Sequence, residues 1–129
     1  MTVPWKLLTT EGWDVYFATE ETILKPSADE VTLHPPKLLS TLGADVETLE
    51  WYKELQEDSR YNSPIKWADL KMDMFDALLL PGGHAPGMKQ YLESKVLQDK
   101  ISQFWQLHRP VAAICHGKCS IDFFEDGSF

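Results

Sequence analysis

The sequence has little cysteine, and this limits the disulfide and metal chemistry open to it. Only two cysteines, Cys115 and Cys119, occur among its 129 residues. Their Cys-x-x-x-Cys spacing has no second pair that would complete a zinc-binding pattern, so we assign no metal site. A disulfide-stapled secreted domain carries more cysteines than this. We therefore expect reduced thiols and a cytoplasmic location.

Basic charge and long apolar runs are also scarce. The formal net charge is −8, from 20 acidic and 12 basic residues. Nucleic acids and anionic membranes both attract basic surfaces, so we expect neither as a partner. No apolar run approaches the roughly 20 residues of a membrane span, and we see no secretory signal. With 43% hydrophobic and 25% charged residues, the composition predicts one globular domain over residues 1–129.

Two apolar stretches are each followed by residues suited to a site. Phe75–Leu80 leads into Pro81-Gly82-Gly83-His84, and Val111–Ile114 leads into Cys115-His116-Gly117. A helical pattern separates them, so we predict a βαβ unit with two parallel strands. Ligands bind at the carboxyl ends of strands in open α/β sheets, where both loops would meet.

The second stretch has the order of a nucleophile elbow, in which a sharp turn after a strand presents a side chain to substrate. Cys115 would stand at the tip of this turn. The backbone N–H groups of His116 and Gly117 would face a developing oxyanion. The alternative is a core strand with a buried, inert thiol, and this stretch alone does not decide between them.

Together the stretches Asp76–His84 and Ala112–Gly117 resemble the DJ-1/PfpI (ThiJ/PfpI) family of the class I glutamine amidotransferase-like superfamily. The resemblance is to its Hsp31-like Cys-His-Gly branch and covers roughly Pro4 to Gly117. It implies a flavodoxin-like, doubly wound parallel sheet in a three-layer α/β/α arrangement. Relative to that fold the first strand and the C-terminal elements would be missing. We therefore expect a partial domain from a truncated gene product.

The resemblance also implies a cofactor-independent activity. Glyoxalase III chemistry would convert a small carbonyl substrate, methylglyoxal, into lactate, and an amidase or peptidase activity is a variant of the same site. Two acidic groups of the family have no match here, because Met1 and Thr2 stand where one should be, and Asp122 and Glu125 lie too close to the elbow for the other. The implied site comprises the catalytic Cys115 and His116 with the oxyanion- or substrate-binding Gly82, Gly83, His84 and Gly117.

Non-enzymatic alternatives remain open at this point. The chain would then be an inactive relative that acts as a redox-sensing thiol or a binding module. His84 would simply cap the turn that follows it. Exposed sheet edges in a partial fold would favour a homodimer or aggregation.

The rest of the chain predicts the elements that frame this unit. We expect a first helix capped by Thr2 and ended by Gly12, with Val3, Leu7 and Leu8 buried. Ser94 should cap a later helix whose apolar stripe is Val96, Leu97, Ile101, Phe104 and Trp105. The other expected elements are strands over 13–19 and 31–33 and helices over 36–42, 45–55 and 88–92.

Overall fold

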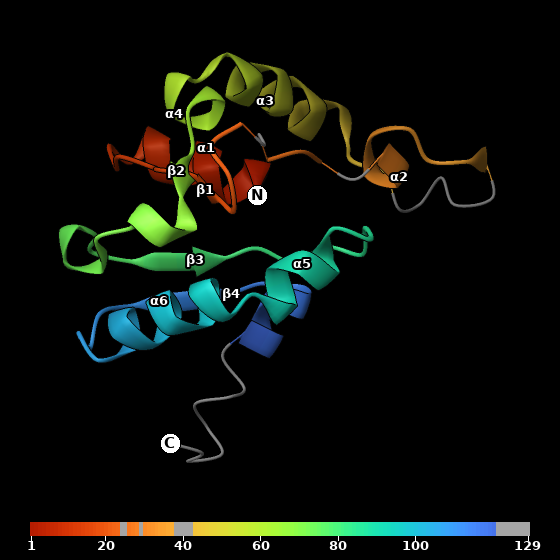
Figure 1. Cartoon of the computed structure of the whole chain (residues 1–129). Coiled ribbons are helices and arrows are strands. Elements are labelled where there is room, and N and C mark those ends of the chain that lie inside the picture. Colours follow the sequence, from red (N-terminus) through yellow and green to blue (C-terminus); the bar gives the residue numbers. More distant parts are fainter. Residues whose placement is uncertain (24–25, 29, 38–42, 121–129) are drawn as a thin grey trace. The chain divides into compact units, whose positions relative to one another are not determined.

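The computed structural model describes residues 1–23, 26–28, 30–37 and 43–120 of the chain (Figure 1). The chain divides into two compact units, Met1–Lys66 and Trp67–Phe129. Each unit combines helices with its own pair of parallel strands, which confirms the predicted α/β class. Among the described residues no helix has both the length and the hydropathy needed to cross a bilayer.

In its described residues the first unit places two parallel strands among four α-helices. Strand β1 pairs with β2, with Ala18 opposite Ile65 and Thr19 opposite Lys66. The elements are α1 (Thr2–Thr10), β1 (Ala18–Thr19), α2 (Glu30–Leu33), α3 (Val46–Glu57), α4 (Ser59–Asn62) and β2 (Ile65–Lys66).

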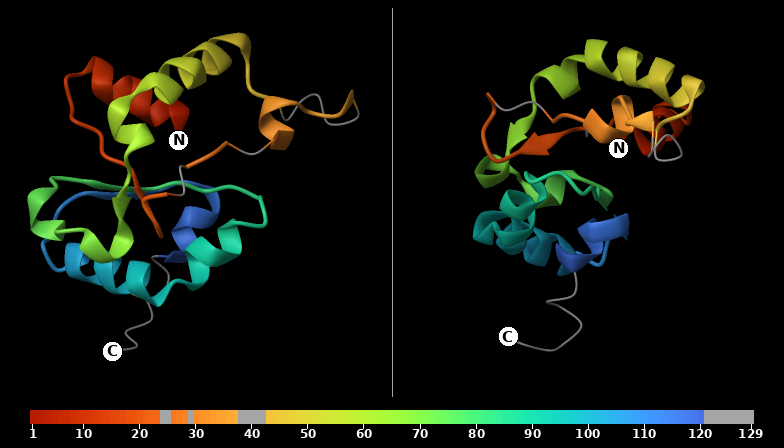
Figure 2. Two further views of the ribbon diagram at one scale, coloured as in Figure 1. Left: turned by 45° about the horizontal axis from the view of Figure 1, so that its top comes forward. Right: turned by 90° about the vertical axis from the view of Figure 1, so that its right-hand side faces the viewer.

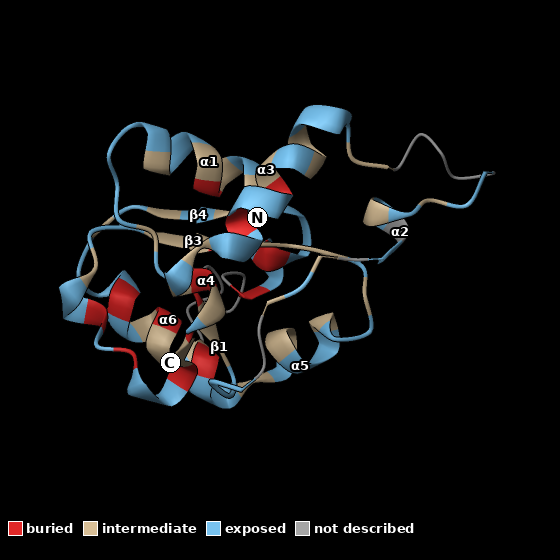
Figure 3. Cartoon of the chain, turned by 90° about the horizontal axis from the view of Figure 1, so that it is seen from above, coloured by how far each residue is buried: buried red, intermediate tan, exposed pale blue. Residues whose placement is uncertain are grey.

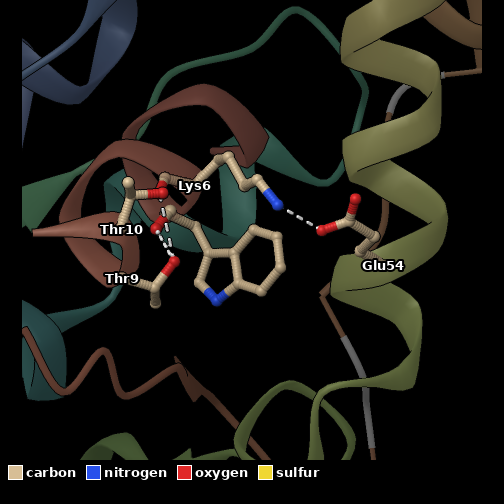
Figure 4. Close-up of polar contacts among 5 residues, drawn as sticks. Lys6, Thr9, Thr10 and Glu54 are labelled. Atoms are coloured by element: carbon tan, nitrogen blue, oxygen red, sulfur yellow. Dashed lines mark hydrogen bonds and ion pairs between the residues drawn. The ribbon is translucent and has the colours of Figure 1, made fainter. Parts of the chain in front are cut away.

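The core of the first unit forms where α1 packs against α3. Its buried residues are mostly aromatic, and the rings of Phe17 and Tyr61 meet edge to face with centroids 5.2 Å apart. Figure 4 shows the polar contacts beside this core, where Lys6 of α1 pairs with Glu54 of α3. The buried cluster consists of Trp5, Phe17, Tyr52, Leu55 and Tyr61.

Several predictions for the first unit are wrong in detail. Helix α1 buries Trp5 and not the predicted stripe, so Val3, Leu7 and Leu8 are exposed. Met1, whose side chain makes no capping hydrogen bond, occupies the N-cap position predicted for Thr2. Gly12 does follow the helix with φ 86°, as a C-terminal glycine should.

Two further predictions concern strands and one concerns a helix. The segment 31–33 belongs to the short helix α2, and the strand predicted over 13–19 is confined to Ala18–Thr19. β-branched and aromatic residues favour strands only weakly, and side-chain packing overrides that preference. The helix predicted over 36–42 falls largely outside the described residues.

The second unit is the predicted βαβ arrangement. Strands β3 and β4 are parallel, with Leu78 opposite Val111 and Leu80 opposite Ala113. Its elements are β3 (Leu78–Leu80), α5 (Met88–Glu93), α6 (Lys95–Trp105), β4 (Val111–Ala113) and 3-10 helices at Trp67–Asp69, Met72–Met74 and Cys115–Ser120.

Helix α6 contributes buried apolar residues to this unit, and Figure 3 colours the chain by burial. Ser94 caps it as predicted, accepting a hydrogen bond at Oγ from the N–H of Leu97. The buried face is narrower than predicted, because Val96 and Trp105 remain exposed. The residues that α6 buries are Leu97, Ile101 and Phe104.

Arg109 fixes the chain just before β4 to the chain just before β3. Its Nη1 donates to the carbonyl oxygens of Asp73, at 2.9 Å, and Phe75. The N–H of Leu78 then donates to the carbonyl of Pro110 at 3.0 Å, where the two strands begin to pair. The two strands therefore start in register, and further views show them running together (Figure 2).

Candidate active site

The parallel register of β3 and β4 brings the two predicted motifs to the same edge of the sheet. The ladder continues past the strands, with the N–H of Ile114 donating to the carbonyl of Leu80 at 3.0 Å. Pro81-Gly82-Gly83-His84 therefore leaves β3 directly beside Cys115-His116-Gly117. This is the meeting of loops that the sequence predicted.

Two glycines allow this close approach of the motifs. A Cβ on Gly82 would lie 2.3 Å from the carbonyl oxygen of Ile114 and 2.6 Å from Cβ of Cys115. A Cβ on Gly117 would lie 2.3 Å from the carbonyl oxygen of Leu80. These distances are far inside van der Waals contact, so each motif carries a glycine where the other motif's backbone passes.

Cys115 adopts the strained backbone of an elbow. Its φ is 54°, in the left-handed region that residues with a Cβ rarely occupy, and its side chain is exposed. It also begins the 3-10 helix Cys115–Ser120. The elbow prediction is therefore confirmed, and the alternative of a buried thiol in a regular strand is wrong.

The turn after Cys115 corrects one expectation about the oxyanion site. The N–H of Gly117 donates to the carbonyl of Ile114 at 3.0 Å and thereby closes the turn. Gly117 is also buried. Its N–H thus serves the fold and is not turned toward a ligand, so the predicted oxyanion role of Gly117 does not match this geometry. Ligand binding by Gly82, Gly83 and His84 stays a prediction.

The strain at Cys115 leads to a stability prediction. Cys115→Gly should be more stable than Cys115→Ala by about 1 kcal/mol, because glycine adopts a left-handed conformation without the cost that a Cβ brings. Neither variant has a thiol, so the difference between their free energies of unfolding reports the backbone strain at position 115. Urea unfolding of the two proteins measures the difference. Equal midpoints would mean that the elbow is not strained in solution.

His116 is held by the backbone of the other motif. Its Nδ1 lies 2.9 Å from the carbonyl oxygen of Gly83 and 3.5 Å from Sγ of Cys115. A carbonyl oxygen only accepts, so the hydrogen bond with Gly83 requires a proton on Nδ1. In the neutral ring this leaves the lone pair on Nε2, where it can take up a proton.

The partner of His116 is a group that sequence analysis missed. The family resemblance implies an acidic side chain that orients this histidine, and Asp122 and Glu125, which are too close to the elbow in sequence to match it, lie outside the described residues. In the structure a backbone carbonyl, that of Gly83, orients the ring instead. Every residue has a carbonyl, so composition gave no signal, although the Gly-Gly pair after β3 marked where backbone could approach.

His84 completes the group. Its ring meets that of His116 edge to face, with centroids 5.0 Å apart and planes at 89°. The sequence-predicted residues Cys115, His116 and His84 are thus brought together, and all three are exposed. A surface hollow elsewhere in the unit, lined by Leu70, Met72, Gln103 and Leu107 among others, includes none of them. The candidate site is therefore identified from its side chains and backbone geometry, and not from a surface hollow.

Comparisons with known proteins identify relatives of this chain. Two relatives named deglycases, from Thermococcus kodakarensis and Pyrococcus abyssi, are 39% and 38% identical over 56 residues, or 43% of this chain and 32% of each relative. An uncharacterised protein of Schizosaccharomyces pombe is 28% identical over 103 residues, or 78% of this chain and 38% of that protein. The chain thus spans about a third of the length of these relatives.

No solved structure matches the chain. The model of the ThiJ/PfpI family-like proteins matches residues 1–126, nearly the whole sequence. That family has the flavodoxin-like α/β fold, with which the parallel strands and flanking helices described above agree. The chain belongs to the ThiJ/PfpI family.

Proposed function

We propose that the chain carries the catalytic site of a cysteine enzyme that acts on small reactive carbonyl compounds. Methylglyoxal is the substrate we propose, converted to lactate without a cofactor. One observation supports this most directly. The exposed Sγ of Cys115, at an elbow, lies 3.5 Å from Nδ1 of His116, whose ring the opposite loop orients. The deglycase names of two relatives point to related chemistry.

The proposed reaction begins with addition of the Cys115 sulfur to the aldehyde carbon of methylglyoxal. The thiol gives up its proton, the carbonyl electron pair moves to oxygen, a proton adds to that oxygen, and a hemithioacetal results. The exposed position of Cys115 gives a small aldehyde access to the sulfur. The Nδ1–H of His116 points at Gly83, which leaves Nε2 as the proton acceptor.

Proton transfer would then carry out the internal redox change. His116 removes the hydrogen on the former aldehyde carbon as a proton, which gives an enediol, and returns a proton to the neighbouring carbon. The aldehyde carbon is oxidised to a thioester while the ketone carbon is reduced to an alcohol, so no outside oxidant or reductant is needed. Water cleaves the thioester and releases lactate and the thiol.

A direct experiment tests this proposal with the two cysteines as a matched pair. Incubation of the full chain with methylglyoxal should form lactate, and Cys115→Ala should lower the rate at least about 100-fold, as loss of a nucleophile does. Cys119→Ala, which also removes an exposed thiol, should behave as the unchanged protein. Equal lactate formation by the unchanged protein and Cys115→Ala would refute the activity.

A redox-sensing thiol is the second candidate, and the exposure of Cys115 beside an imidazole favours it. Mild peroxide would then oxidise Cys115 to a sulfenic and further to a sulfinic acid, with peroxide reduced to water. Mass spectrometry of the peptide that holds both cysteines distinguishes the candidates. Rapid oxidation at Cys115 without lactate formation would favour the sensor, and lactate formation would favour the enzyme.

A further inference from the structure

A three-ligand group is present at the sheet edge that the proposed reaction does not use as a unit. One donor atom from each of His84, Cys115 and His116 lies within 4.8 Å of the donor atoms of the other two. In the described part of the chain, this is the group of three histidine, cysteine or acidic side chains whose donor atoms lie close enough together to hold a metal ion. It draws on both motifs, so it exists only because β3 and β4 pair in this register.

The distances are near those of a tetrahedral zinc ion. Zn–S and Zn–N bonds of about 2.3 and 2.0 Å place neighbouring donor atoms about 3.2 to 3.8 Å apart. Three exposed side chains that already lie within 4.8 Å need only small rotations to reach this spacing. The two glycines keep the loops that carry these ligands in contact.

The ligand types select the metal. A thiolate and two imidazoles suit zinc and other thiophilic ions, whereas magnesium and calcium require oxygen ligands, which this group does not contain. The carbonyl of Gly83 adds the outer support that metal-binding histidines usually have. It lies 2.9 Å from Nδ1 of His116 and holds the ring beside the thiol of Cys115, whose Sγ lies 3.5 Å from the same nitrogen.

We propose that His84, Cys115 and His116 bind a zinc ion and that the bound ion blocks the thiol. Zinc binds the thiolate, so binding displaces the thiol proton to solvent and ties up the sulfur lone pairs. It also engages an imidazole nitrogen that would otherwise accept protons. The ion is therefore a reversible cap on Cys115, removed by a chelator. This site does not depend on methylglyoxal being the substrate.

The test uses the metal-free full chain and added Zn²⁺, with iodoacetamide as the thiol probe and mass spectrometry as the readout. Saturating Zn²⁺ should slow alkylation of Cys115 at least about tenfold, and EDTA should restore it. Alkylation of Cys119, exposed in the same turn and not part of the group, should not change. Equal alkylation of Cys115 with and without Zn²⁺ would overturn the proposal.

Variants assign the ligands. His84→Ala should raise the Zn²⁺ concentration needed for half protection at least about tenfold, whereas His108→Gln, an exposed histidine outside the group, should not. Co²⁺ in place of Zn²⁺ gives an independent signal, a thiolate-to-cobalt absorption that Cys115→Ser removes and Cys119→Ser retains. If Zn²⁺ protects Cys115 from alkylation equally well in the His84→Ala and His108→Gln variants, the three-ligand site is wrong. None of these readouts requires enzymatic activity, so failure of the proposed function would be seen separately.

Discussion

Gly117→Ala and Gly82→Ala should each destabilise the second unit by about 3 kcal/mol, at the upper end of the cost of overpacking. In Gly117→Ala the new methyl would lie 2.3 Å from the carbonyl oxygen of Leu80 and 2.8 Å from that of Pro81. The Leu80 carbonyl cannot withdraw easily, because it accepts the Ile114 N–H that continues the strand ladder. Relief of the clash therefore requires separation of the two motifs. Urea unfolding and the alkylation rate of Cys115 report on both effects.

The same chain contains well-matched control glycines. A Cβ on Gly83 would meet only the flexible side chain of Met88, with its sulfur 3.4 Å away, and a Cβ on Gly87 would meet nothing within 4 Å. Both lie in the segment that follows β3 and neither has positive φ. Gly83→Ala and Gly87→Ala should therefore change stability by less than about 1 kcal/mol. If all four variants unfold alike, the close approach of the motifs at Gly82 and Gly117 does not exist in solution.

The arrangement of the second unit could be predicted from sequence because its signals are local and strong. An apolar run that ends in Gly-Gly-His, a capped helix with a clear apolar stripe and a second run that ends in Cys-His-Gly specify a βαβ unit. Ser94 as the N-cap, the parallel pairing and the elbow at Cys115 were all predicted correctly. Chain geometry then places both loops at one edge.

The incorrect predictions concern burial and secondary structure in segments where the sequence favours no single outcome and tertiary packing decides. In α1 the stripe Val3, Leu7 and Leu8 has helical spacing, but the larger Trp5 on a different face is the residue buried against α3. Segment 31–33 has strand-forming residues and is nevertheless helical. Period and propensity describe only the chain itself, whereas burial depends on which neighbour packs against it.

The sequence predicted which side chains form the candidate site, but it did not predict the roles of the backbone groups around them. Cys115 and His116 were predicted as site residues because thiol and imidazole have distinctive chemistry. The carbonyl of Gly83 and the turn-closing N–H of Gly117 were not, because backbone groups leave no trace in composition. The zinc proposal rests on a grouping of His84, Cys115 and His116 that the spacing of the cysteines alone does not indicate.

The second large effect is expected at His116. His116→Gln should lower the rate of lactate formation by about 10² to 10⁴, the usual contribution of a positioned acid or base. Glutamine keeps a polar amide at this exposed position, but the amide nitrogen matches Nε2 and not the Nδ1 that donates to Gly83, so the fold of the variant has to be measured. The amide cannot accept and return protons near neutral pH. The measurement is the steady-state rate with methylglyoxal, alongside thermal unfolding to confirm that the variant is folded.

Chemical rescue separates proton transfer from a purely structural role of His116. Added imidazole should restore part of the activity of His116→Ala, because a free base can occupy the space that the side chain vacated, and it should not restore Cys115→Ala. His108→Gln provides the background for loss of an exposed histidine outside the site. If His116→Gln keeps its rate within about threefold, or if imidazole has no effect on His116→Ala, then another group moves the proton. The orientation of His116 by Gly83 would in that case serve only to hold the turn that carries the thiol.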